Sequence, residues 1–136
     1  MRSICILGST GSIGVNTLDV IRKHPNLFSV RALTAHSNVD LLAKQCLEFK
    51  PELAVVGSEL AAQQLKDKLT GTTLKIRILH GPQSLVIAST LDQIDTVMAA
   101  IVGAAGLLPT IAAAKKGKRI LRSEEHTSEL QSHSFI

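Results

Sequence analysis

A glycine-rich segment near the amino terminus carries the residue types and the spacing that bind phosphate. It reads GSTGSIG from Gly8 to Gly14, and it lies between a short apolar run and an amphipathic stretch. Gly8 allows a tight turn after a strand, and Gly11 lets the backbone approach an anion because it has no Cβ atom. Gly14 lets the next helix pack close to the sheet, and the free N–H groups that begin this helix would point at the anion.

The phosphate contacts expected from this segment are Thr10, Gly11, Ser12 and Ile13, and the hydroxyl of Ser9 can add a hydrogen bond. A spaced glycine triplet is weak evidence alone, but between a strand and a helix it is typical of dinucleotide binding. The alternative is a Gly/Ser turn in a parallel sheet that holds no ligand. The GxxGxxG spacing favours NADP over NAD.

The end of the second predicted strand bears on the choice of dinucleotide. NAD-specific domains usually place Asp or Glu there, about 20 residues beyond the loop, to bind the ribose 2′-hydroxyl. Here His36, Ser37 and Asn38 stand at that point, and the first acid is Asp40. The three residues and the N–H groups of the next helix can accept a 2′-phosphate, so we predict NADPH as the cofactor. The alternatives are that Asn38 only caps the helix and that His36 is only an exposed loop residue.

Other polar or small residues have plainer explanations. Asp92 and Asp95 fit a solvated turn better than an acid/base pair or a metal site, and His80 fits a loop. The segment 103–106 (GAAG) either admits a ligand at the carboxyl edge of a sheet or packs a helix tightly on it. Four cations lie close together at Lys115, Lys116, Lys118 and Arg119. They fit the favourable placement of positive charge at the end of a helix better than a nucleic-acid-binding patch.

The bulk composition indicates one α/β domain. The 136 residues are 45% hydrophobic but only 2% aromatic, which fits the aliphatic core of a parallel sheet. The net charge of +4 and the scarcity of aromatics argue against nucleic-acid binding. No run reaches the roughly 20 apolar residues of a membrane span, and no signal or transit peptide is expected, so we predict a cytoplasmic protein. Cys5 and Cys46 are expected to be buried, without a disulfide or a metal.

Strand patterns alternate with helix patterns along the chain. We predict strands over residues 3–7, 28–35, 53–56, 74–79, 96–102 and from 118, and helices over 12–24, 39–49, 58–69, 82–89 and 107–116. Asn38 and Ser58 are candidate N-caps, Pro109 fits a first helical turn, and Gly117 fits a helix end. This order predicts a Rossmann-like, doubly wound parallel sheet with helices on both faces, incomplete at its carboxy-terminal end.

The last residues depart from this pattern. Residues 122–133 read RSEEHTSELQSH, which resembles the in-frame translation of a common sequencing adapter. We therefore expect a binding domain over residues 1–121 and an extraneous, disordered tail over 122–136, in which His126 and His133 have no function. The alternative is a natural polar tail.

Several segments together resemble the amino-terminal domain of 1-deoxy-D-xylulose 5-phosphate reductoisomerases. They are ILGSTGSIG at 6–14, TLDV at 17–20, QCLEF at 45–49 and above all VMAAIVGAAGLLP at 97–109. The resemblance covers residues 1–121. By position it implies NADPH contacts at Thr10, Gly11, Ser12, Ile13, His36, Ser37 and Asn38, with residues 103–106 near the nicotinamide.

The resemblance also implies an activity for a longer parent enzyme. Members of the family are NADPH-dependent oxidoreductases of non-mevalonate isoprenoid biosynthesis that rearrange and reduce 1-deoxy-D-xylulose 5-phosphate to 2-C-methyl-D-erythritol 4-phosphate. They use a divalent cation (Mg, Mn or Co), form homodimers and are the target of fosmidomycin. His36 and Ser37 depart from the Gly-Lys common in the family. Arg122 to Glu125 replace a Leu-Ala-Asn-Lys-Glu segment, and the metal ligands and substrate site lie beyond this chain, so we expect the fragment to have no catalytic residues and no activity.

Two other functions remain open on the sequence alone. One is a different NADP-dependent oxidoreductase with a similar front half, such as a dihydrodipicolinate reductase-like enzyme. The other is a dinucleotide-binding module without enzymatic activity.

Overall fold

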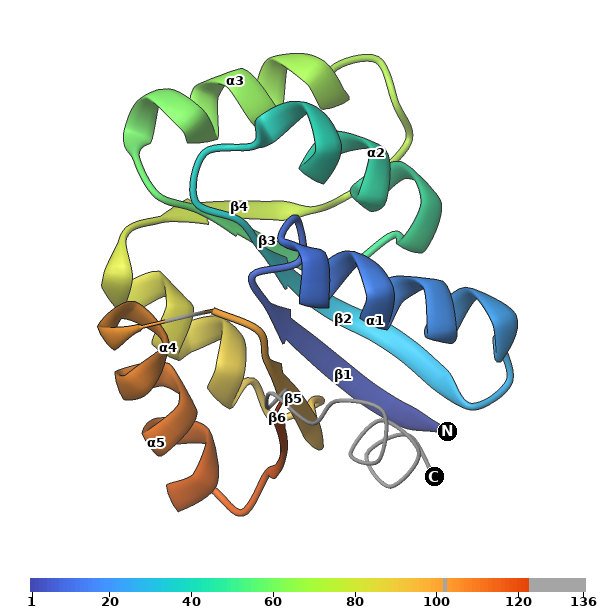
Figure 1. The fold of residues 1–136 in the computed structure, drawn as a ribbon. Helices are drawn as coiled ribbons and strands as arrows, with labels where there is room; N and C mark the ends of the chain where they lie inside the picture. Colours follow the sequence, from blue (N-terminus) through green and yellow to red (C-terminus); the bar gives the residue numbers. More distant parts are fainter. Residues whose placement is uncertain (102, 123–136) are drawn as a thin grey trace.

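The computed structural model describes residues 1–101 and 103–122 (Figure 1). Within them, six strands form one parallel sheet in the order β4-β3-β2-β1-β5-β6. The strands are β1 (Arg2–Leu7), β2 (Phe28–Thr34), β3 (Leu53–Val56), β4 (Arg77–His80), β5 (Thr96–Ala99) and β6 (Arg119–Arg122). The helices are α1 (Ser12–Lys23), α2 (Val39–Phe49), α3 (Glu59–Leu69), α4 (Pro82–Thr90) and α5 (Leu107–Lys115), with a short 3-10 helix η1 (Ala104–Gly106). The predicted doubly wound fold is confirmed.

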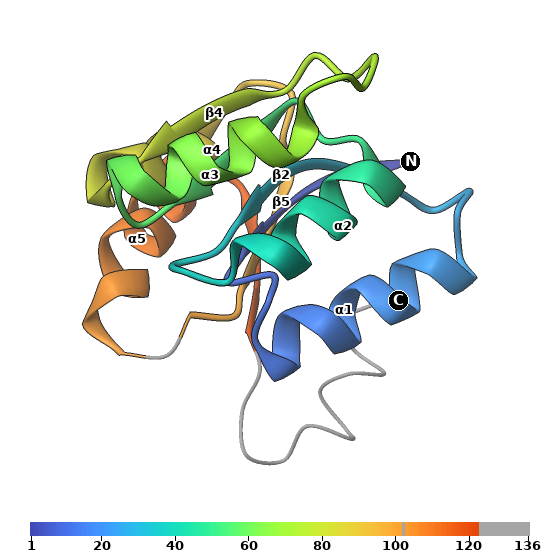
Figure 2. The ribbon, with the colours of Figure 1, turned by 90° about the horizontal axis from the view of Figure 1, so that it is seen from above.

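Helices cover both faces of the sheet. Helices α1, α2 and α3 lie side by side on one face, and α4 and α5 lie on the other (Figures 1 and 2). The central strand β1 serves both layers, because Ile4 and Ile6 pack in the core under the first three helices while Cys5 and Leu7 pack in the core under the other two. This burial on both faces explains why residues 4–7 of the strand are all apolar.

The strand order reverses at β1. The chain adds β2, β3 and β4 on one side of β1, and then crosses to the other side to form β5 and β6. Parallel sheets of this kind bind ligands in the crevice outside the carboxyl ends of the strands at such a reversal. The glycine-rich segment leaves β1 at this point, with Leu7 paired to Ala99 of β5.

Several predictions based on local sequence agree with the structure. Helix α2 and strand β3 have the predicted bounds. The Asn38 side chain accepts a hydrogen bond from the N–H of Leu41 at 3.2 Å, and Ser58 accepts one from the N–H of Ala61 at 3.1 Å. Both predicted N-caps are therefore confirmed.

Strands β1, β2 and β6 begin or end one residue from their predicted bounds, and Arg122, placed in the tail by the sequence interpretation, is the last residue of β6. Strands β4 and β5 differ more, because their partner strands end. Strand β4 begins at Arg77, opposite Leu53, since β3 has no residue in the sheet that could pair with 74–76. It continues to His80, so the prediction of a loop at this histidine was wrong. Strand β5 ends at Ala99, opposite the last residue of β1, and not at 102. Residue 102 itself lies outside the described residues, as do residues 123–136 of the predicted tail.

The two cysteines are buried and unpaired, as predicted. Burial raises the pKa of the Cys46 thiol to about 12 and raises the pKa of Cys5 as well, so neither is ionised at neutral pH. In residues 1–101 and 103–122, no cluster of His, Cys, Asp and Glu could hold a metal ion. No helix in the same part of the chain has the length and apolar character that crossing a membrane requires.

Candidate functional site

The segment between β1 and α1 is a tight turn anchored to β2. Gly8 has φ +83°, a left-handed conformation that favours glycine. Its N–H donates to the Oγ1 atom of Thr34 at 2.8 Å, and the N–H of Ser9 donates to the Thr34 carbonyl at 2.7 Å. These two bonds fix the start of the turn at the carboxyl end of the neighbouring strand.

Gly14 brings the first turn of α1 against this loop. A Cβ atom at position 14 would lie 2.2 Å from the carbonyl oxygen of Gly8 and 2.5 Å from the Cα atom of Ser9. Both are backbone atoms, which cannot swing aside as the end of a side chain could. The helix therefore packs closely at this glycine, but against the loop that follows β1 and not against a strand, as the sequence had suggested.

Gly11 stands in a different environment. A Cβ atom there would have the Gly8 oxygen as its nearest neighbour, at 3.8 Å, and φ is an ordinary −78°. Among the described residues, the N–H groups of Thr10, Ser12 and Ile13 donate to no protein acceptor. The loop thus presents free backbone donors and open space at the amino end of α1, which is the arrangement that binds anions.

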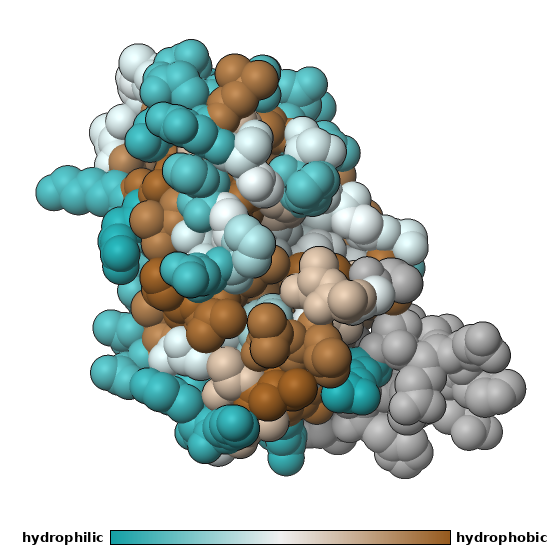
Figure 3. Space-filling view, turned by 90° about the vertical axis from the view of Figure 1, so that its left-hand side faces the viewer, coloured by the Kyte–Doolittle hydropathy of each residue, from teal (hydrophilic) through white to brown (hydrophobic). Residues whose placement is uncertain are grey.

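A cavity of about 510 Å³ opens beside these donors. It lies along the carboxyl ends of the strands, and its wall is mostly small or apolar, with Ala35, Val56, Ala100 and Ile101 among the lining residues. Figure 3 views the molecule from the side toward which the strands point, and apolar side chains gather on this face. Such a lining suits flat rings and sugars, with polar atoms of the loop at one end.

The structure brings only some of the predicted contacts into this cavity. Thr10, Gly11 and His36 line it, while Ser12 and Ile13 begin α1 next to them. Ser37 and Asn38 line a separate, open hollow of about 420 Å³, between the start of α2 and the α3 residues Gln64, Asp67 and Lys68. The side chain of Lys68 pairs with Asp40 there, at 2.5 Å.

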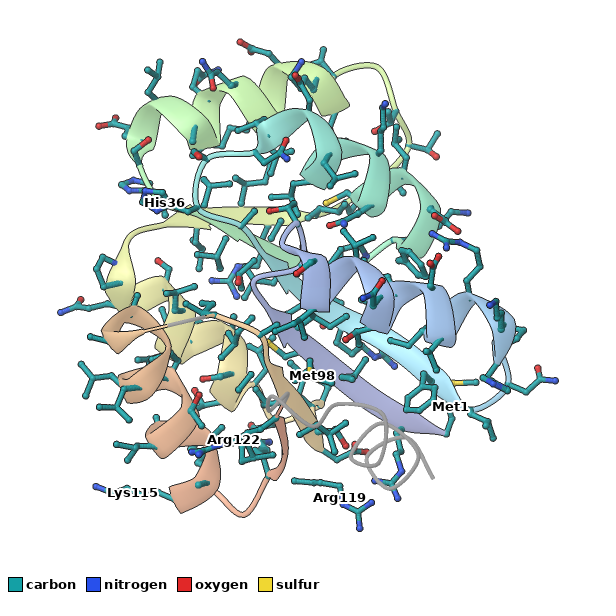
Figure 4. All side chains as sticks on the ribbon, in the orientation of Figure 1. Met1, His36, Met98, Lys115, Arg119 and Arg122 are labelled. Carbon is teal, nitrogen blue, oxygen red and sulfur yellow. The ribbon has the colours of Figure 1, made fainter. Side chains whose placement is uncertain are left out.

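Gly57 is a lining residue that the sequence interpretation missed. A Cβ atom at this position would lie 2.4 Å from the Nδ1 atom of His36, and the Gly57 N–H donates to the His36 carbonyl at 2.8 Å. Figure 4 shows His36 projecting from the loop after β2 toward the beginning of α3. Gly57 therefore leaves the space that this imidazole occupies. A glycine directly after a buried strand was the signal available for it.

The segment 103–106 touches two cavities. Ala105 lines the main cavity, whereas Gly103 and Gly106 line a smaller hollow of about 240 Å³ that also includes Thr110 and Arg122. A Cβ atom at Gly106 would lie 3.0 Å from the carbonyl oxygen of Ile101, so tight packing accounts for this glycine. The structure therefore accounts for Gly106 by close packing, while the approach of a ligand to this segment stays a prediction.

The two acidic candidates, Asp92 and Asp95, do not form a functional pair: one is exposed to solvent and the other is hydrogen-bonded within the sheet. The Asp95 carboxylate accepts from Thr96 Oγ1 at 2.8 Å and from the Ser3 N–H at 3.3 Å, at the amino edge of the sheet. Asp92 is exposed in the preceding turn. Neither residue lies near the glycine-rich loop, which is at the opposite edge.

Comparison with known proteins gives one family. The family model described as 1-deoxy-D-xylulose 5-phosphate reductoisomerase matches residues 4–125. Relatives of that name from Burkholderia cenocepacia and Saccharophagus degradans are 52% and 47% identical over 135 and 136 residues. These alignments cover 99% and 100% of this chain but 34% and 35% of the relatives. The chain thus spans about a third of the length of these relatives.

Solved structures give the same result. A structure of DOX-P reductoisomerase in complex with NADPH, fosmidomycin and magnesium is 39% identical, with a TM-score of 0.86, over 98% of this chain and 35% of that one. The enzyme from Zymomonas mobilis in complex with NADPH is 37% identical, with a TM-score of 0.83, over 90% of this chain and 32% of that one.

We predict that alanine destabilises the protein at Gly14 but has almost no effect on stability at Gly11. Gly14→Ala places a methyl group inside backbone atoms of the loop, and we expect it to lower the free energy of unfolding by about 3 kcal/mol or more. Gly11→Ala adds the same methyl group in open space, and we expect a change within about 0.5 kcal/mol. Urea titration followed by circular dichroism measures both. Equal stability of the two variants would contradict the packing described for Gly14.

Proposed function

Because the chain belongs to the 1-deoxy-D-xylulose 5-phosphate reductoisomerase family, we propose that it is the NADPH-binding portion of such an enzyme. One observation carries this proposal. Backbone amides at Thr10, Ser12 and Ile13, which have no acceptor within residues 1–101 and 103–122, adjoin a cavity of about 510 Å³ at the point where the strand order reverses. A dinucleotide needs both parts, anion donors for its pyrophosphate and an apolar cavity for its rings and sugars.

We assign the two charged parts of the cofactor to different segments. The pyrophosphate binds the amides and hydroxyls of residues 10–13, where the dipole of α1 favours negative charge. The 2′-phosphate of the adenosine ribose binds the segment His36–Ser37–Asn38, next to the start of α2. His36 is at the edge of the main cavity, while Ser37 and Asn38 face the adjoining hollow, so this phosphate would lie between the two.

The complete reaction is proposed for the longer parent enzyme only. There, NADPH supplies a hydride for the reduction that follows rearrangement of 1-deoxy-D-xylulose 5-phosphate, and the product is 2-C-methyl-D-erythritol 4-phosphate. This chain contributes the binding of the cofactor. The divalent cation, the sugar-phosphate substrate and the homodimer interface are assigned to the parent, and we expect no turnover by the chain of 136 residues.

The family match decides against a dihydrodipicolinate reductase-like enzyme. The cytoplasmic location stays a prediction, as does the division into a binding unit over 1–121 and an extraneous tail.

Calorimetric titration of the chain with NADPH and with NADH tests the proposal. We expect NADPH to bind more tightly than NADH. Gly11→Val should weaken NADPH binding at least about 100-fold, or about 2.7 kcal/mol, because its side chain occupies the space of the phosphate without disturbing the loop. Gln93→Val, an exposed change in the turn before β5, is the control. Full affinity in the Gly11 variant, or preference for NADH, would reject the proposal.

A second variant tests the assignment of the 2′-phosphate. Ser37→Lys adds a cation beside the proposed phosphate position, and we expect NADPH to bind about fivefold to tenfold more tightly, since a charge-assisted contact at an exposed site contributes about 1 kcal/mol. NADH, which lacks the phosphate, should bind as before. Ser37→Met, of similar length without charge, is the control. An equal gain for both nucleotides would show that the 2′-phosphate lies elsewhere.

A further inference from the structure

A buried glutamine on α2 forms two hydrogen bonds with the glycine-rich loop. The hydroxyl of Ser9 donates to the Oε1 atom of Gln45 at 2.7 Å, and the Nε2 atom of Gln45 donates to the Ser9 carbonyl at 2.9 Å. Ser9 is 0% exposed and Gln45 is 6% exposed. The two residues are 36 positions apart in the sequence, so the pair ties together distant parts of the chain.

This pair is unusual for its surroundings. Two residues close to Gln45 on α2, Leu42 and Cys46, belong to the hydrophobic core under the first three helices. A side-chain amide inside such a core is costly unless its polar atoms are satisfied. Here the Gln45 amide nitrogen donates to the Ser9 carbonyl, and the Gln45 amide oxygen accepts from the Ser9 hydroxyl. Both ends of the buried amide are therefore hydrogen-bonded. A mutually satisfied polar pair in an apolar region favours one arrangement over all others.

The position of the pair determines what it can hold in place. Gly8 and Ser9 are fixed from β2 by Thr34 and from α2 by Gln45, and the free amide donors begin at the next residue, Thr10. Helix α2 begins directly after its N-cap Asn38, in the segment assigned to the 2′-phosphate. The helix therefore connects the two anion-binding segments as one rigid element.

We propose that Gln45 is a positioning residue that sets the loop amides relative to α2, so that both charged parts of a dinucleotide meet donors already in place. The proposal rests on the proposed function for its ligand, but not for its geometry. Binding is tighter when the donors are preorganised, because less freedom is lost on association. Gln45 touches no ligand in this account and acts through Ser9.

The alternative is that Gln45 only fills the core. Gln45→Met tests this, because methionine has a similar volume and length but makes neither hydrogen bond. If the residue only fills space, the variant changes global stability at most. If it positions the loop, the variant loosens the loop and weakens the binding of NADPH while the core remains intact.

The experiment first measures amide hydrogen exchange by NMR in the ligand-free chain. The reporter is the N–H of Ser9, and core amides of β2 and β3 report global unfolding. We expect Gln45→Met to accelerate exchange at Ser9 by about tenfold with little change in the core amides, in line with the loss of about one net hydrogen bond. Gln63→Met, at an exposed glutamine of α3, is the matched control and should change neither.

Titration with NADPH then measures the consequence for binding. We expect about tenfold weaker binding by Gln45→Met and a smaller loss for Ser9→Ala, which removes only one of the two hydrogen bonds. The double variant should lose less than the sum of the two free-energy changes, because both act through one interaction. Gln45→Glu should recover binding as the pH is lowered, since a protonated carboxyl group can again donate to the Ser9 carbonyl.

The outcomes are separable. Unchanged exchange at Ser9 and unchanged NADPH affinity in Gln45→Met would overturn the positioning role. Failure of the unaltered chain to bind NADPH would reject the proposed function, while exchange at Ser9 would still decide whether Gln45 holds the loop. If Gln45→Met does not fold, the same comparison is made with Ser9→Ala, where unaltered exchange and affinity would overturn the proposal.

Discussion

The structure depends on a short stretch of backbone whose amides have no acceptor in the described part of the chain. At Thr10, Ser12 and Ile13 the chain changes from strand to helix, and neither element can satisfy these N–H groups. Such a segment is stable only where solvent or a ligand reaches it and where its neighbours are firmly fixed. The surrounding features meet both needs. Gly8 takes a conformation that side chains disfavour, Gly14 admits α1 within contact of the loop, and Thr34 and Gln45 bind the residues just before the free amides.

The topology places this stretch where a ligand can reach it. Because β2 and β5 lie on opposite sides of β1, their connections diverge and leave a cavity at the carboxyl edge of the sheet. The wall of the cavity is formed by residues that directly follow the strands, such as Gly8, Ala35 and Gly57. Small side chains at these positions leave the space of the cavity open where the chain turns. The proposed cofactor site is thus a product of the sheet as a whole, even though the proposed anion donors come from a single loop.

Much of this arrangement could be predicted because it is local in the sequence. Asn38 and Ser58 mark the starts of their helices by hydrogen bonds to residues only three positions further along the chain, and the glycine spacing identifies the loop. The bounds of β4 and β5 could not be predicted, because the ends of other strands set them. The same is true of Gly57 against His36 and of Gln45 against Ser9, whose contacts join residues that are far apart in the chain. The separation of Ser37 and Asn38 from the main cavity likewise depends on the packing of α2 beside α3, whose residues Gln64, Asp67 and Lys68 line the same hollow.

A crystal structure of the chain with NADPH tests the central claim most directly. The account predicts pyrophosphate oxygens within about 3 Å of backbone amides in the segment 10–13, with Ser9 still bonded to Gln45 and the adenosine end near His36. A dinucleotide bound at any other place, with these amides facing only solvent, would contradict it.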